Sequence, residues 1–228
     1  MVRKSFRLAA ILLVAFSVAN SVGAQDILTA EEFFANVSAN YADIQDYVAD
    51  MSWQDGSGTM TGSLLYKRPN KLRIEFSRPS GQILVSDGSV LKIYQPGLNV
   101  VLQQDLSGLG GGPAGLVSEE GLALMRRNYA IAYLEGPEPV PLDEESSLLV
   151  TKLRLDRRQR SESFRELILS VDQDGFIRRI EGTRVDWQNV QMDLNEIRID
   201  QGLSDRVFEE DPDPSASVNE NFLSDPEG

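Results

Sequence analysis

Residues 62–96 read GSLLYKRPNKLRIEFSRPSGQILVSDGSVLKIYQP. Within this stretch Leu72, Ile74 and Phe76 alternate with charged or polar residues, which is the two-residue period of a strand with one apolar and one polar face. The Asp87-Gly88 pair stands between two short apolar runs and tolerates the positive φ that a tight hairpin turn requires. The stretch therefore predicts a meander of antiparallel strands.

Short strand-like segments at regular intervals extend this meander in both directions. We expect strands at 47–53, 59–66, 71–76, 81–85, 90–94, 99–104, 129–134, 148–155, 164–171, 176–185 and 190–199. The apolar positions change parity after Leu194, which predicts a bulge near Asn195 and Glu196, and Val207-Phe208 is a candidate last short strand. Such spacing favours one curled antiparallel sheet over a βαβ repeat.

Two segments have helical character. Thr29 and Glu32 form the capping-box pattern, and an apolar face at helical spacing follows over 31–41. A second helix is expected from about Pro113 to Arg127, after the glycine-rich segment 107–115. Residues 110–115 also satisfy G-x-G-x-x-G, but a dinucleotide site requires a parallel βαβ context, so we interpret the glycines as a hinge.

The N-terminus has the features of a secretory signal peptide. A basic start is followed by the apolar run 8–18 and by small residues before Gln25, so we expect cleavage after residue 24, with an uncleaved anchor as the alternative. The protein is then expected in the periplasm. Residues 25–209 are interpreted as one domain, and the acidic, Pro-rich residues 210–228 as a disordered tail.

The charge of the chain limits its partners. The sequence has 22 Lys and Arg and 35 Asp and Glu; without the three basic residues of the signal peptide, 19 remain against 35, a net charge of −16. This disfavours nucleic acid and an anionic membrane surface, and it favours a soluble monomer.

The chain contains neither cysteine nor histidine. Disulfides, Cys or His metal sites and the Ser-His-Asp type of catalytic triad are therefore excluded, and we expect no cofactor. The remaining enzymatic alternative is a carboxylate hydrolase using Asp87, Asp174 and Glu181, although the two aspartates are better interpreted as hairpin-turn residues.

The order G-x-L-x-x-K-R-P-N, alternating strand, proline, ILVSDG and aromatic-x-Pro across residues 62–96 resembles the LolA family, the periplasmic carriers of bacterial outer-membrane lipoproteins. The resemblance implies an α+β fold in which an open antiparallel β-barrel, a curved sheet of about eleven strands, has a helical lid over a hydrophobic cavity. It further implies a non-enzymatic carrier of acylated lipoproteins, with an inner-membrane ABC-type releasing complex and an outer-membrane acceptor as partners. A relative that carries another lipid or senses envelope stress is the alternative within this family.

The expected site combines one arginine with an apolar wall. Arg68, at the end of a predicted strand, is suited to hold helix C-terminal carbonyls, which favour cations, and the resemblance implies that it clasps the lid. The acyl-chain cavity is expected to be lined by Leu65, Leu72, Ile74, Phe76, Leu84, Ile93, Leu122 and Met125. Alternation alone reports burial, so a solid core built from the same residues remains open.

Overall fold

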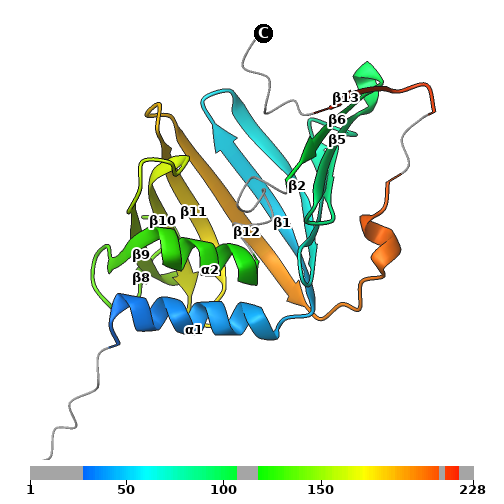
Figure 1. Cartoon of the computed structure of the whole chain (residues 1–228). Helices are drawn as coiled ribbons and strands as arrows, with labels where there is room; N and C mark the ends of the chain where they lie inside the picture. The colour runs from blue at the N-terminus through cyan, green and yellow to red at the C-terminus, as the bar shows by residue number, and fades with distance from the viewer. Residues whose placement is uncertain (1–27, 107–117, 211–213, 221–228) are drawn as a thin grey trace, which may run out of the picture.

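The structure is a computed structural model in which residues 28–106, 118–210 and 214–220 are described (Figure 1). The predicted signal peptide, the glycine-rich segment and the expected helix start at Pro113 lie outside these ranges. None of the helices within them is long and apolar enough to cross a membrane.

The predicted curved, open antiparallel sheet is confirmed, and in the described ranges it has thirteen strands. The first meander consists of β1 Asp46–Asp55, β2 Gly58–Lys67, β3 Lys71–Arg78, β4 Ile83–Ser86, β5 Val90–Gln95 and β6 Val100–Asp105. The second consists of β7 Tyr129–Tyr133, β8 Val140–Pro141, β9 Leu149–Arg157, β10 Phe164–Asp172, β11 Ile177–Arg184 and β12 Asn189–Ile199. The strand β13 Ser217–Glu220 was not predicted, and neither was the two-residue β8.

The two meanders are joined through their long strands. The order across the sheet is β13-β6-β5-β4-β3-β2-β1-β12-β11-β10-β9-β7, so β1 pairs with β12, far away in the sequence. The predicted bulge is present, because the register shifts where Val48 and Asp50 face Arg198 and Asn195, and Glu196 has a positive φ of 47°. A bulge increases the local bend and twist of a strand. It therefore adds to the curvature at the junction.

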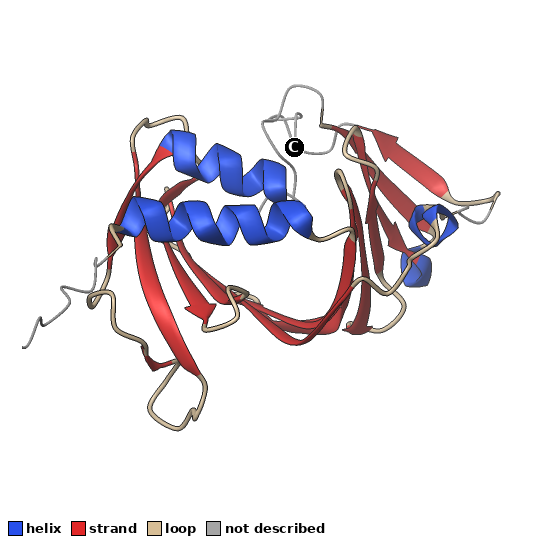
Figure 2. Ribbon diagram, turned by 90° about the horizontal axis from the view of Figure 1, so that it is seen from below, coloured by secondary structure: helices blue, strands red, loops and turns tan. Residues whose placement is uncertain are grey.

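Two helices lie on the concave side of the sheet (Figure 2). Helix α1 spans Ala30–Asp43, and the predicted capping box is confirmed, with the backbone N–H of Glu32 donating to Thr29 Oγ1 at 3.2 Å. Helix α2 spans Glu119–Asn128 and is capped by Ser118, so it begins later than the predicted start at Pro113. Ser118 accepts the N–H of Gly121, which satisfies one of the free donors of the first turn.

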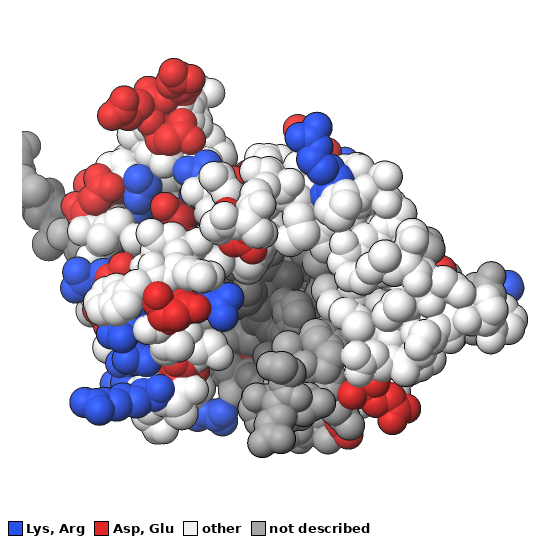
Figure 3. Space-filling view, turned by 90° about the horizontal axis from the view of Figure 1, so that it is seen from above, with Lys and Arg blue, Asp and Glu red and all other residues white. Residues whose placement is uncertain are grey.

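The helices pack against each other and against β7. Phe34, Val37 and Tyr41 of α1 and Leu122 and Met125 of α2 belong to the main core cluster, together with residues from the concave face of β1–β4, β9–β12 and β5. Seen from the end at which β1 finishes, charged side chains gather over the helix-covered half, and the half built from β3–β6 is mostly uncharged (Figure 3).

The chain after β12 crosses the outer side of β3–β6, which differs from the predicted disordered tail. We call residues 203–210 and 214–220 the C-terminal strap. It begins with the 3-10 helix η3, Asp205–Phe208, where the sequence predicted a short strand, and it ends in β13, which pairs in parallel with β6. Composition predicted disorder for residues 210–228 because they include few apolar side chains, but the free edge of β6 supplies backbone partners for residues 217–220 that composition does not report.

Named contacts hold the strap in place. Arg73, only 9% exposed, donates from Nη1 to the carbonyl of Val207 and to Glu210 at 2.8 Å. The hydroxyl of Tyr94 donates to the carbonyl of Glu210 at 2.6 Å. Ala216 packs against a second apolar cluster formed by Val85, Tyr94 and Val101 on the outer face. The strap thus covers apolar surface and neutralises a buried cation.

We expect Ala216→Asp to lower the melting temperature by several degrees, because a carboxylate would face this apolar cluster without a partner. Val218→Asp is the matched control, since Val218 lies two residues further along the strap, in β13, but is 51% exposed. Thermal unfolding of both variants is the measurement. Equal melting temperatures for the two would contradict the docked strap.

A second prediction concerns Asp205, whose carboxylate lies 2.6 Å from Lys67 Nζ and 3.2 Å from Lys71 Nζ. Hydrogen bonds from these lysines lower the pKa of Asp205 below its ordinary 3.8, so its contribution to stability is present above that pH and is lost as the pH falls through the lowered value. The difference in melting temperature between wild type and Asp205→Asn should therefore narrow on acidification. A pH-independent difference in melting temperature between wild type and Asp205→Asn would refute the linkage.

Candidate functional site

The concave face carries most of the expected apolar wall. Seven of the eight residues lie in or against the main core cluster. Leu72, Ile74, Phe76, Leu84 and Ile93 are on the side of the sheet that faces the helices, and Leu122 and Met125 belong to α2. Phe76 and Ile93 are only partly buried, whereas Leu72 and Leu122 have no exposed surface. The wall is therefore continuous from β3–β5 to α2, and its contact with acyl chains stays a prediction.

Leu65 is the exception: the sequence prediction assigned it to the cavity wall on the concave face, whereas the structure places it on the outer face. Its neighbours Leu64 and Tyr66 are each 1% exposed and belong to the core cluster, while Leu65 is half-buried opposite Arg73 and Val48 on the outer side. Because side chains alternate along a strand, only one set of β2 can face the helices. The Leu64-Leu65 pair left this parity undetermined in the sequence.

A group of buried tyrosines, absent from the site predicted from the sequence, lies under the C-terminal half of α1. The rings of Tyr47 and Tyr66 are 5.2 Å apart, and Tyr41 packs edge-on against Tyr47 at 6.2 Å. The hydroxyl of Tyr41 accepts the backbone N–H of Ile177 at 3.1 Å, and that of Tyr66 donates to the carbonyl of Pro69 at 2.9 Å. Burial raises the pKa of Tyr66 to about 12, so its hydroxyl stays protonated. The sequence signal that could have identified these tyrosines is the alternation of side chains along β1 and β2, which places Tyr47 and Tyr66 on the concave face.

Arg68 connects both helices to the end of β2. Its Nη1 donates to the carbonyl of Ala42 in the last turn of α1, and its Nη2 lies 3.2 Å from the carboxylate of Glu119, the first residue of α2. A cation is favoured at a helix C-terminus and an anion at an N-terminus, so the guanidinium and Glu119 complement both helix dipoles. We call this three-residue contact the Arg68 clasp.

The clasp lies at a half-open position. The side chain of Arg68 is 35% exposed and that of Glu119 is 47% exposed, so water and salt screen their attraction. An exposed ion pair contributes about 1 kcal/mol or less. The clasp therefore fixes the positions of the two helix ends, and breaking it when the helices separate costs little free energy.

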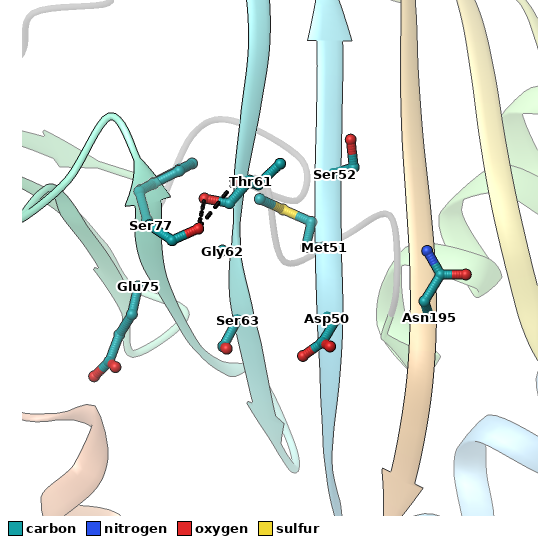
Figure 4. Close-up of a pocket in the computed structure, with 10 residues that line it drawn as sticks. Asp50, Met51, Ser52, Thr61, Gly62, Ser63, Glu75, Ser77 and Asn195 are labelled. Atoms are coloured by element: carbon teal, nitrogen blue, oxygen red, sulfur yellow. Dashed lines mark hydrogen bonds between the residues drawn. The ribbon is translucent and has the colours of Figure 1, made fainter.

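The outer face has a polar groove of about 560 Å³ across β3, β2, β1 and β12 (Figure 4). Carboxylates of Asp50 and Glu75, the hydroxyls of Ser63 and Ser77 and the amide of Asn195 project into it. Met51 and Phe76 also border this groove, but an acyl chain there would cover the polar groups, which would lose water without gaining partners. The apolar candidate site is therefore the concave face alone.

The structure does not bring the hydrolase candidates together. Asp87 accepts the N–H groups of Ser89 and Val90 in the β4–β5 turn, and Asp174 lies in the β10–β11 turn. Glu181 lies within β11, which β3, β2, β1 and β12 separate from β4. Within the described ranges no three His, Cys, Asp or Glu side chains are grouped so as to hold a metal ion.

Comparisons with known proteins agree with this arrangement. Residues 49–211 match the profile of the family described as outer membrane lipoprotein carrier protein LolA. The chain is similar to an outer-membrane lipoprotein carrier protein of Methylobacillus flagellatus, with 29% identity over 62% of this chain and 71% of the relative. A protein of the same description from Cupriavidus pinatubonensis is 39% identical over 27% of this chain and 29% of the relative.

Among solved structures, an uncharacterised conserved protein from Thermus thermophilus has a similar fold. The TM-score is 0.55 at 13% identity, over 84% of this chain and 98% of that protein. At such low identity the likeness concerns the fold alone, and the family assignment depends on the sequence match. That match covers more than half of the sequence and includes β12, most of β1 and Arg68. The chain belongs to the LolA family of outer membrane lipoprotein carrier proteins.

Proposed function

We propose that this protein is a periplasmic carrier that encloses the acyl chains of lipoproteins between the concave face and the two helices, and that it moves them from the inner to the outer membrane. The observation that carries the proposal is the combination of a continuous apolar face with helices tied across it by a screened polar contact, the Arg68 clasp. Family membership and the names of the relatives support the same cargo.

The energies involved favour reversible opening. Burying one CH₂ group contributes about 0.8 kcal/mol, so one long acyl chain supplies on the order of 10 kcal/mol at most. The clasp contributes about 1 kcal/mol or less at its exposed position. The binding of one acyl chain therefore supplies more free energy than breaking the clasp requires. Because opening exposes apolar core residues of α2, such as Leu122, part of the gain is returned and the cargo can leave.

The remaining features of the proposal come from the sequence. The predicted signal peptide directs the chain to the periplasm, and an inner-membrane ABC-type complex and an outer-membrane acceptor are the partners that such a carrier requires. Native mass spectrometry of protein purified from the periplasm of its own host tests the proposal. Retained lipoprotein would support it; a protein consistently isolated with a different lipid would instead favour a lipid carrier with other cargo.

Phe76→Asp should abolish the binding of an acylated peptide, because an ion would face hydrocarbon on the concave side. Ser77→Asp is the matched control: it is the next residue of β3, it is exposed, and its hydroxyl is hydrogen-bonded to Thr61, whereas Phe76 packs against the core cluster. Fluorescence titration of both folded variants with an acylated peptide gives the affinities. Undiminished binding by Phe76→Asp would remove the concave face from the site.

Arg68→Leu should loosen the helix ends in the empty protein. We expect amide hydrogen exchange in α2 to rise about fivefold, as the loss of a screened ion pair implies, with Arg68→Lys intermediate because lysine lacks the planar fork. In a transfer assay with a labelled lipoprotein, the variant should load normally and deliver poorly, since the closed empty state has lost stability relative to the loaded state.

Arg78→Leu is the control for this experiment, because Arg78 is exposed and has no salt bridge within the described residues. If α2 exchange and lipoprotein transfer are both unchanged in Arg68→Leu, the clasp has no role in the carrier cycle.

A further inference from the structure

Three chain segments meet at the end of the sheet where β9, β11 and β1 finish. The β9–β10 turn touches the β11–β12 turn, because the N–H of Val185 donates to the carbonyl of Ser163 at 3.2 Å. It also touches the end of α2, because the N–H of Arg158 donates to the carbonyl of Asn128 at 2.8 Å. The order β12-β11-β10-β9-β7 places these segments in one row, about 20 Å long at the usual strand spacing.

This row gathers arginines in a chain whose net charge is −13. We call it the arginine rim and define it by Arg126, Arg127, Arg157, Arg158, Arg160, Arg165 and Arg184. These seven residues are about a third of the 22 Lys and Arg of the protein. Figure 3 shows blue side chains gathered on the left of the face seen from this end.

Most of the rim lacks a carboxylate partner. Arg158 lies 3.6 Å from Glu31, and Arg184 lies 3.7 Å from Asp186. The other five form no salt bridge within the part of the chain that the structure describes, although Asp156 and Glu162 lie nearby in sequence. The rim therefore carries a surplus of positive charge, in contrast to the rest of the molecule.

An aromatic side chain projects from the same rim. Trp187, in the β11–β12 turn, is 72% exposed and has a positive φ of 68°, which a bulky residue rarely adopts. The guanidinium of Arg165 lies 4.0 Å from the centre of its ring and donates from Nε and Nη2 to the carbonyl of Val185 at 3.2 Å. This stacking holds the ring in a strained turn at the tip of a hairpin, outside the core.

We propose that the arginine rim and Trp187 form a docking surface for a bilayer that contains anionic phospholipids. Guanidinium groups bind phosphate oxygens through two parallel hydrogen bonds, and tryptophan favours the boundary between headgroups and acyl chains. The rim is a row of turns and a helix end, which suits a broad layer of headgroups better than one enclosed ligand. An acidic protein would satisfy the arginines but gives no reason for an exposed tryptophan beside them.

The acidic remainder of the protein makes this docking oriented and reversible. Only the rim is attracted to an anionic surface, and the other faces are repelled from it, so the molecule approaches in one orientation and does not stay bound. The overall charge, which disfavours general adsorption, is therefore compatible with docking at one end. The inference concerns the empty protein and does not depend on the proposed cargo.

Co-sedimentation of the empty protein with vesicles of phosphatidylcholine, with and without phosphatidylglycerol, tests the proposal. We expect binding to the anionic vesicles only, and its loss at about 0.5 M salt through screening. The triple variant Arg126→Gln, Arg127→Gln, Arg160→Gln should bind at least about tenfold more weakly. The control triple variant Lys92→Gln, Arg198→Gln, Arg206→Gln removes the same charge away from this end of the sheet and should bind within about twofold of wild type.

A second readout uses Trp187 itself. In a Trp53→Phe background its fluorescence emission should move to shorter wavelength on anionic vesicles, because the ring enters a less polar environment. Equal weakening by the two triple variants, or no binding by wild type at low salt, would overturn the proposal; arginine-dependent capture of acidic proteins without vesicle binding would assign the rim to a protein partner instead. Failure here leaves the carrier function untouched, since no cargo is present.

Discussion

The fold depends on the backbone pairing between β1 and β12, which joins two meanders that are separate in the sequence. Residues from Tyr47 to Gln54 pair with residues from Ile199 to Gln191, so the first and the last long strand become neighbours in the middle of one sheet. The bulge at Asn195 and Glu196 bends the sheet at this junction. Without the pairing, the two halves would be separate small sheets, and no concave face would exist for the helices to cover.

That concave face has two kinds of contact with the helices. Apolar side chains such as Phe34 and Leu122 supply the bulk of the attraction, and the Arg68 clasp determines where the helix ends lie. Arg73, on the next strand, has the opposite task on the outer face, where the C-terminal strap buries it against Glu210. Arg68 is screened by solvent and can release its partners, while Arg73 is buried and holds the strap in place.

The distribution of charge distinguishes one basic end of the molecule from its otherwise acidic surface. Net negative charge keeps the protein dissolved and repels it from anionic membranes in most orientations. The arginine rim is a local exception on a row of turns, and Trp187 projects there at 72% exposure. A carrier that must approach bilayers without remaining on them benefits from such a separation, with the apolar face covered by helices and the attractive surface limited to one end.

The sequence by itself determined the strand periodicity, the capping box at Thr29 and Glu32, the bulge, the family and seven of the eight residues of the apolar core between sheet and helices, because these follow from local pattern. It misplaced Leu65, since two adjacent leucines in β2 leave the parity open until a partner strand is fixed. It also predicted disorder for residues 210–228, of which 217–220 pair with β6, and a strand where η3 forms, because edge pairing with β6 and the contacts of Arg73 and Tyr94 join residues more than a hundred positions apart. The β1–β12 junction, the two helix ends that meet at Arg68 and the row of arginines at one end were decided only by the tertiary structure, because each requires distant segments to be brought together before any local rule applies.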